Sequence, residues 1–106
     1  MTYKEILKMQ LGDKTKVDVE FLKEVERDLQ ITWEDDDTAK ILSSYIKTGV
    51  EVLQNDVGTS IDFDEDKIAR GLLRTYVRYA WNKSEEFFIE NNLEMLLKLE
   101  VKYGKD

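Results

Sequence analysis

Three aspartates at alternate positions, Asp62, Asp64 and Asp66, have the spacing in this chain that most resembles a metal site. They match the first, third and fifth positions of a calcium-binding loop, whose side-chain oxygens coordinate the ion. That loop also needs glycine at its sixth position and glutamate at its twelfth, where this chain has Lys67 and Leu73. Both requirements fail, so we expect no metal at this cluster.

Other catalytic chemistry has few side chains to work with. The 106 residues include no histidine and no cysteine, which removes the usual triads, thiol nucleophiles and ordinary zinc sites. The five glycines are scattered and form no phosphate-binding motif. The acidic runs Asp35–Asp37 and Glu85–Glu86 are typical of helix starts, where negative charge complements the helix dipole. We therefore expect a chain that is not an enzyme and binds no cofactor.

Four cations recur at helical spacing on this otherwise acidic chain: Lys67, Arg70, Arg74 and Arg78. Residues three and four apart lie on one side of a helix, so these four would form a basic stripe. Two interpretations stay open: solvated side chains paired with acidic neighbours, or a contact with another subunit. Tyr79 falls beside the stripe and off the predicted apolar face, so we expect it to be exposed and include it among the candidate contacts.

The charge balance bears on the class of partner. The chain carries 23 acidic and 16 basic residues, a net charge of −7, and such a surface disfavours binding to nucleic acid or anionic membranes. The N-terminus lacks the basic start and apolar run of a signal peptide. No stretch approaches the roughly 20 apolar residues that span a bilayer. We expect a soluble, cytosolic product with no membrane partner.

Helices must position these side chains. Apolar residues recur at i, i+3 and i+4 in four segments, which predicts helices at about 18–29, 37–55, 64–81 and 84–97. The fold class is therefore all-α, as a small, four-helix bundle-like single domain over residues 17–104. The apolar side chains that define the predicted helix faces are Phe21, Leu22, Val25, Leu29, Ile41, Leu42, Tyr45, Ile46, Val50, Leu53, Ile68, Ala69, Leu72, Leu73, Tyr76, Val77, Ala80, Trp81, Phe87, Phe88, Leu93, Leu96 and Leu97.

The remaining segments are less regular. Residues 1–16 are poorly patterned and are expected to form a flexible N-terminal arm. Gly58 is placed to end the second helix, and Gly49 inside that helix would let a neighbouring helix approach closely. The segment 97–103 alternates apolar and polar residues, which is typical of a half-buried strand. A continuation of the fourth helix and an extended tail remain as alternatives.

The order of features along the chain forms a pattern of its own. It consists of Trp33–Asp37 after the first helix, Ile41, Tyr45 and Ile46 in the second, Tyr76, Tyr79 and Trp81 in the third, Phe87–Phe88, Asn92–Leu97, and the closing run Val101–Gly104. This order resembles the small head–tail connector proteins of tailed bacteriophages, also called head-completion or adaptor proteins. The resemblance covers roughly residues 17–104 and includes no catalytic signature.

The resemblance implies a structural role in a virion, at the junction of head and tail, for a protein made in the cytoplasm of a bacterial host. Such proteins are helical bundles that form rings, commonly of about twelve copies, between the portal protein and a tail-side connector or stopper protein. The ring extends the channel for packaged DNA without reading its sequence. Flexible segments grip the portal, which makes residues 1–16, the loop 55–63, Val101 and Tyr103 candidate contacts.

Two other classes of function stay in play. A small acidic helical domain could regulate or inhibit a basic partner protein through its negatively charged surface. A helical DNA-binding domain could instead use the basic stripe of Lys67, Arg70, Arg74 and Arg78. Ring formation would support the connector function and a salt-dependent shift of DNA would support the DNA-binding function. A stable monomer that shows neither would favour the regulatory function.

Overall fold

The computed structural model describes Glu5, Met9, residues 19–32 and residues 35–104. Within these residues every regular element is helical, which confirms the predicted all-α class. The predicted N-terminal arm, residues 1–16, lies outside the described residues except for Glu5 and Met9. Asp18, at which the first predicted helix begins, also lies outside them.

Five α-helices and one 3₁₀ turn follow one another along the described chain. They are α2 (Val19–Asp28), α3 (Asp36–Val57), α4 (Lys67–Trp81), the turn η2 (Glu85–Phe87), α5 (Phe88–Asn91) and α6 (Leu93–Lys102). Three of the predicted helices are therefore present, and the fourth is divided into three pieces. None of the helices described is long and apolar enough to cross a membrane.

Polar side chains explain where the fourth helix is divided. The Asn92 side chain donates to the Phe88 carbonyl oxygen at 2.8 Å, which offers the backbone an alternative to continuing the α-helical pattern. Asn82 and Ser84, at the junction of the third and fourth predicted helices, close the end of α4. Their side chains donate to the carbonyl oxygens of Arg78 and Tyr79, at 2.9 and 3.2 Å.

The ends of α3 follow standard capping chemistry. The Thr38 backbone N–H donates to Asp35 Oδ1 at 2.7 Å, and this hydrogen bond holds the pKa of Asp35 below its usual value. At the other end Gly58 adopts a left-handed conformation, with φ of 79°, and its N–H donates to the Gln54 carbonyl oxygen. The prediction that Gly58 ends this helix is confirmed.

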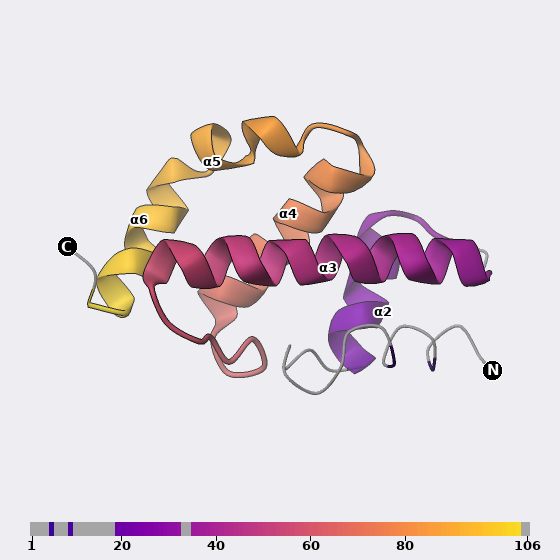
Figure 1. Ribbon diagram of the computed structural model, residues 1–106, viewed down its shortest axis with the longest axis horizontal. Coiled ribbons are helices and arrows are strands. Elements are labelled where there is room, and N and C mark those ends of the chain that lie inside the picture. The colour runs from indigo at the N-terminus through magenta and orange to yellow at the C-terminus, as the bar shows by residue number, and fades with distance from the viewer. Residues whose placement is uncertain (1–4, 6–8, 10–18, 33–34, 105–106) are drawn as a thin grey trace.

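Helix α4 lies at the centre of the fold and packs against α2, α3, α5, α6 and η2. Figure 1 shows α3 crossing in front of α4, with α6 beside the C-terminal end of α3. The two long helices approach each other closely at Gly49. A Cβ atom there would lie 2.6 Å from Leu73 Cδ1 and 2.8 Å from Tyr76 Cδ1, so the predicted close approach is confirmed.

The buried face of α3 differs in part from the predicted one. Ile41, expected in the core, is 44% exposed, and Tyr45 is only partly buried. Thr38 and Ser43 are buried in the same helix instead. Ser43 is accommodated because its hydroxyl donates to the Lys40 carbonyl oxygen, at 3.0 Å, within the helix.

The alternating segment 97–103 is helical as far as Lys102, so neither the strand nor the extended tail forms. Leu99 is fully buried and Tyr103 packs against the core, whereas Leu97 and Val101 face solvent. Leu99 and Tyr103 are four residues apart and so lie on one side of the helix. Leu97 and Val101 are also four residues apart and lie on the opposite side. The alternation arises because α6 has apolar side chains on two opposite sides.

Candidate docking surface

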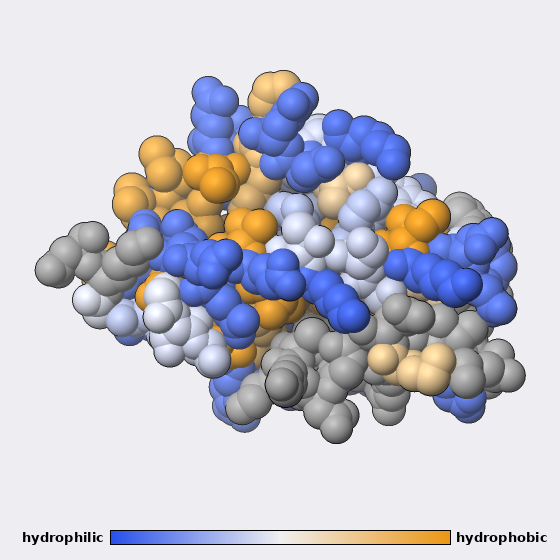
Figure 2. All heavy atoms as spheres, viewed as in Figure 1, coloured by the Kyte–Doolittle hydropathy of each residue, from blue (hydrophilic) through white to orange (hydrophobic). Residues whose placement is uncertain are grey.

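Apolar side chains gather on the surface of the C-terminal segment. Of the eight large hydrophobic side chains that are exposed among the described residues, six lie between residues 87 and 101: Phe87, Ile89, Leu93, Met95, Leu97 and Val101. Figure 2 shows hydrophobic side chains collected over α5 and α6. Val101, a predicted contact residue, is the most exposed of the six at 75%. Such a concentration on a small protein is typical of a docking surface.

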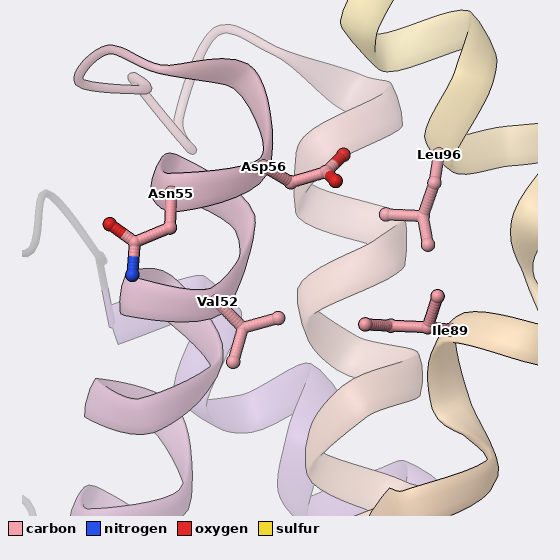
Figure 3. A pocket seen from close by; sticks show the side chains of 5 residues that line it. All are labelled: Val52, Asn55, Asp56, Ile89 and Leu96. Carbon is pink, nitrogen blue, oxygen red and sulfur yellow. The ribbon is translucent and has the colours of Figure 1, made fainter.

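A groove adjoins this surface between α3 and the C-terminal helices. It has a volume of about 360 Å³ and is lined by Val52, Asn55, Asp56, Ile89 and Leu96. Figure 3 shows Val52 and Asp56 of α3 pointing towards Ile89 and Leu96. Because the lining is mainly apolar, the groove fits a hydrophobic side chain of a protein partner better than a polar small molecule.

A second groove of about 360 Å³ lies between α4 and the start of α6. It is lined by Lys67, Ile68, Gly71, Leu72, Thr75, Asn92 and Met95. The C-terminal helices thus have a hollow on the side of α3 and another on the side of α4. Protein partners commonly place anchoring side chains in hollows of this kind.

Tyr103, the other predicted contact in the tail, faces the protein interior. Its hydroxyl donates to Asp66 Oδ2 at 2.7 Å, and Lys102 Nζ lies 3.2 Å from Asp66 Oδ1. Burial, together with the negatively charged acceptor, raises the pKa of Tyr103 to about 12. The structure therefore gives Tyr103 a role in attaching the end of α6 to the start of α4.

The aspartate cluster that resembles a calcium loop is occupied by protein groups. Asp66 is only 4% exposed and caps α4 by accepting the Ala69 backbone N–H at 3.0 Å. Asp62 accepts the Asp64 backbone N–H at 3.0 Å. Across the described part of the chain, no three acidic, histidine or cysteine side chains are grouped so that they could hold a metal ion.

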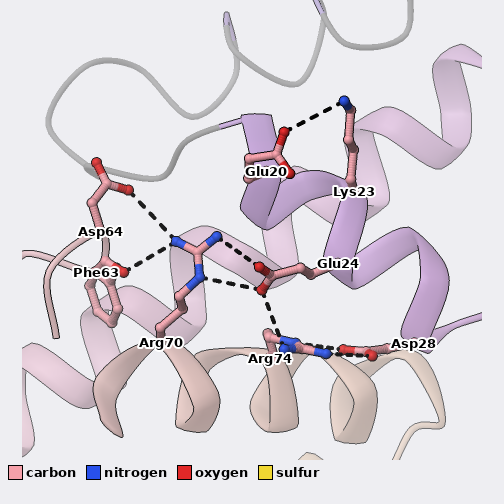
Figure 4. A network of polar contacts seen from close by, with 8 residues as sticks. All are labelled: Glu20, Lys23, Glu24, Asp28, Phe63, Asp64, Arg70 and Arg74. Carbon is pink, nitrogen blue, oxygen red and sulfur yellow. Dashed lines mark hydrogen bonds and ion pairs between the residues drawn. The ribbon is translucent and has the colours of Figure 1, made fainter. Parts of the chain in front are cut away.

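The middle of the basic stripe lies against α2, as Figure 4 shows. Arg70 donates to both carboxylate oxygens of Glu24, at 3.1 and 3.3 Å, and to the Phe63 carbonyl oxygen at 3.4 Å. Its guanidinium also lies 3.8 Å from Asp64 and 5.4 Å from the ring centre of Phe21. The Arg70 side chain is only 16% exposed, so these contacts are made where water screens them little.

Arg74 extends the same network by one turn of α4. It makes two hydrogen bonds of 2.8 Å to Asp28 and lies 3.3 Å from Glu24. The hydrogen bonds from Arg74 to Asp28 raise the pKa of Arg74, against the opposing effect of burial, so the guanidinium stays charged. Arg70 and Arg74 are therefore paired with acidic neighbours within one chain. A contact of either arginine with another subunit stays a prediction.

The other candidate contacts on α4 differ in exposure. Lys67 and Arg78 are exposed at the two ends of the helix. Tyr79, expected to be exposed, is half-buried: its ring and that of Phe88 are nearly perpendicular, with their centres 5.9 Å apart. Its hydroxyl accepts a hydrogen bond from the Asn91 side chain at 3.3 Å. Whether any of these residues contacts another subunit stays a prediction.

The pairing of Arg70 leads to a prediction about stability. Arg70→Glu would place a third carboxylate against Glu24 and Asp64, so we expect the free energy of unfolding to fall by about 3 kcal/mol. Urea denaturation followed by circular dichroism measures this loss. Arg78→Glu is the matched control, because Arg78 is exposed on the same helix; its cost should stay below about 1 kcal/mol. Equal losses for the two variants would contradict a structural role for the Arg70 network.

The comparisons with known proteins do not identify a relative. No family model, curated protein or solved structure matches this chain. The interpretation of the surface therefore depends on its own geometry. That geometry combines an apolar C-terminal surface, two adjoining grooves and a basic stripe whose two central arginines are engaged internally.

Proposed function

We propose that this chain is a structural adaptor of a tailed-bacteriophage particle or prophage, a subunit of a ring that joins the portal vertex to the tail. The ring would contain about twelve copies and would help to retain packaged DNA. The observation that carries the proposal is the concentration of exposed apolar side chains between residues 87 and 101. A soluble monomer gains nothing from such a surface, whereas an assembly subunit needs one.

The distribution of charge supports docking to protein over binding to DNA. Two of the four cations in the basic stripe, Arg70 and Arg74, already neutralise Glu24 and Asp28. Phosphate binding by these two would require breaking half-buried ion pairs. The net charge of −7 fits a channel along which DNA slides without adhering. A DNA-reading function is therefore the weaker alternative.

An exposed acidic segment keeps a regulatory function as the second candidate. Asp36 and Asp37 begin α3 and are exposed, and Asp35, which caps the helix, is exposed as well. Three adjacent carboxylates at a helix start could bind a basic patch on one partner protein. A stable one-to-one complex without rings would favour this candidate over the adaptor.

The decisive test is assembly with the portal protein of the same phage or prophage. Negative-stain imaging of a mixture of the two should show a ring of this protein seated on the portal. Val101→Lys should reduce ring occupancy at least tenfold, because it places a charge in the apolar contact surface. Ile41→Lys is the matched control, because Ile41 is also an exposed apolar residue but lies on α3. The Ile41→Lys protein should form rings as the wild type does.

The variant at Val101 is a cleaner test than deletion of residues 101–106. Deletion would remove Lys102 and Tyr103, both of which contact Asp66, and so would disturb the fold as well as the surface. Absence of rings with and without the portal protein would contradict the adaptor function. Equal assembly of the Val101 and Ile41 variants would show that the apolar surface is not the portal contact.

A further inference from the structure

Helix α6 has apolar side chains on two opposite sides. Leu96 and Leu99 are at most 2% exposed and belong to the core. Leu93, Leu97 and Val101 are 52%, 52% and 75% exposed. Because they are spaced at i, i+4 and i+8, these three form one continuous strip, termed here the α6 stripe. An exposed apolar strip of this kind marks a surface that a partner covers.

The charges on α6 differ from those of the chain as a whole. The helix contains two glutamates and two lysines, so its net charge is zero, whereas the whole chain carries −7. Electrostatic repulsion between two copies of this acidic protein is therefore small at α6. Glu94 and Lys98 lie along the same edge of the α6 stripe, with their charged atoms 4.0 Å apart. Both are well exposed, so each can also reach a charge on a partner.

We propose that the α6 stripe of the free protein is covered by the α6 stripe of a second copy, with the two helices antiparallel about a twofold axis near Leu97. Residues on one edge of α6 in the first copy then lie against the same edge of α6 in the second copy. Glu94 of one copy consequently lies beside Lys98 of the other, at both ends of the contact. The opposed helix dipoles add to this complementarity.

The register of this pair follows from the spacing of the stripe. Leu97 lies at the twofold axis and therefore meets Leu97 of the second copy. Leu93 and Val101 are each four residues from Leu97, so Leu93 of one copy comes level with Val101 of the other. Leu93 lies two turns along the helix from its own counterpart, a separation of about 12 Å.

The pairing goes beyond the proposed ring. A ring is built from contacts between two different faces, whereas the twofold pair uses the same face twice. The stripe cannot serve its second copy and the portal at the same time, so the pair is a state of the free subunit that opens on docking. We therefore expect the purified protein to form this pair whether or not it later assembles into a ring.

Cysteine cross-linking tests the pair directly, because the chain contains no cysteine of its own. Leu97→Cys should form an interchain disulfide under mild oxidation at least about tenfold faster than Ile41→Cys, an exposed apolar position on α3. Leu93→Cys alone should link slowly, since a disulfide needs Cα atoms within about 7 Å. An equal mixture of Leu93→Cys and Val101→Cys chains carrying different tags should form the mixed dimer.

Two results would overturn the proposal. Equal rates for Leu97→Cys and Ile41→Cys would show that the stripes do not meet. Rapid self-linking of Leu93→Cys would show a parallel register instead of an antiparallel one. Sedimentation gives an independent readout: the wild type should dimerise, and Leu97→Glu should raise the dimer dissociation constant at least about tenfold. Failure of these tests leaves ring assembly on the portal untouched, and failure of ring assembly leaves the pair untouched.

Discussion

Replacing Gly49 with leucine is expected to lower the free energy of unfolding by about 3 kcal/mol or more, a large effect for a change at one residue. Even the single Cβ of alanine would lie 2.6 Å from Leu73 Cδ1 and 2.8 Å from Tyr76 Cδ1. Leu73 is fully buried and Tyr76 is 7% exposed, so neither side chain has free space to move into. The overlap must therefore be relieved by separating α3 from α4.

Gly49→Ala decides between two opposing effects. Alanine favours a helix interior over glycine by about 1 kcal/mol, whereas overpacking costs about 1–3 kcal/mol. We expect the overlap to prevail, with a net loss of about 1 kcal/mol in urea denaturation. Gly71 supplies the matched control, because it also lies inside a helix. Among the described residues, no atom beyond its chain neighbours and the backbone of its own helix lies within 4 Å of its Cβ position. Gly71→Ala should therefore stabilise the protein by about 1 kcal/mol.

The two positions together separate helix propensity from packing. The propensity gain is nearly the same at both glycines, so the difference between the two alanine variants measures the crowding between α3 and α4. A stabilising Gly49→Ala variant would contradict the close approach described for these helices. Such an outcome would also remove the physical reason for glycine at this position.

The basic stripe illustrates how much of the surface the sequence determines. The period of the apolar residues predicts helix α4 and places its four cations on one side of that helix. It does not show which residues of another helix lie against those cations. Glu24 and Asp28 are four residues apart on α2, the same spacing as Arg70 and Arg74 on α4. This matching spacing is a signal for the pairing, yet it joins residues 46 positions apart and requires knowledge of which helices pack together.

Helix α6 shows where a periodic pattern misleads. Alternation over residues 97–103 satisfies the strand pattern because an inner row and an outer row of apolar residues interleave. The inner row, Leu99 and Tyr103, is predictable as core. The outer row, Leu93, Leu97 and Val101, is recognisable as i, i+4, i+8 only once the segment is known to be helical. The docking role proposed for Leu93 and Leu97 could therefore not be recognised while strand and helix both remained open for this segment.

Replacing Asp66 with alanine is the other change expected to have a large effect, a loss of about 3 kcal/mol. The carboxylate is 4% exposed and contacts three groups: the Ala69 backbone N–H at the start of α4, and the Tyr103 hydroxyl and the Lys102 ammonium group at the end of α6. Loss of a helix cap costs about 1 kcal/mol, and a polar partner left without its acceptor adds about 1–3 kcal/mol. Urea denaturation at pH 7 measures the total.

The stability supplied by the Asp66 charge should depend on pH in one direction. Burial acts to raise the pKa of Asp66, but hydrogen bonds from Ala69, Tyr103 and Lys102, together with the charge of Lys102, lower it below the usual value. A pKa lower in the folded than in the unfolded chain means that the carboxylate stabilises the fold above about pH 4. This contribution is lost as the pH falls through the folded pKa.

Asp66→Asn separates the charge from the cap, because the amide oxygen can still accept the Ala69 N–H. At pH 7 we expect Asp66→Asn to cost about 1–2 kcal/mol, less than Asp66→Ala. The difference from the wild type should shrink when denaturation is repeated between pH 4 and pH 2.5. Asp35, whose pKa is also lowered, is present in both proteins, so its own titration cancels in that difference. A difference that stays constant over this range would show that the charge of Asp66 contributes nothing.

A double-mutant cycle measures how much of this stability comes from the contact between Asp66, at the start of α4, and Tyr103, at the end of α6. Tyr103→Phe removes the hydroxyl that donates to Asp66 at 2.7 Å and keeps the ring. If the two groups act through this hydrogen bond, Tyr103→Phe should cost about 1–2 kcal/mol in the wild type and much less in Asp66→Asn. Additive costs would mean that the Tyr103 hydroxyl and the Asp66 charge act independently. In that case the buried side chains Leu96 and Leu99 would hold α6 in place without help from the polar contact.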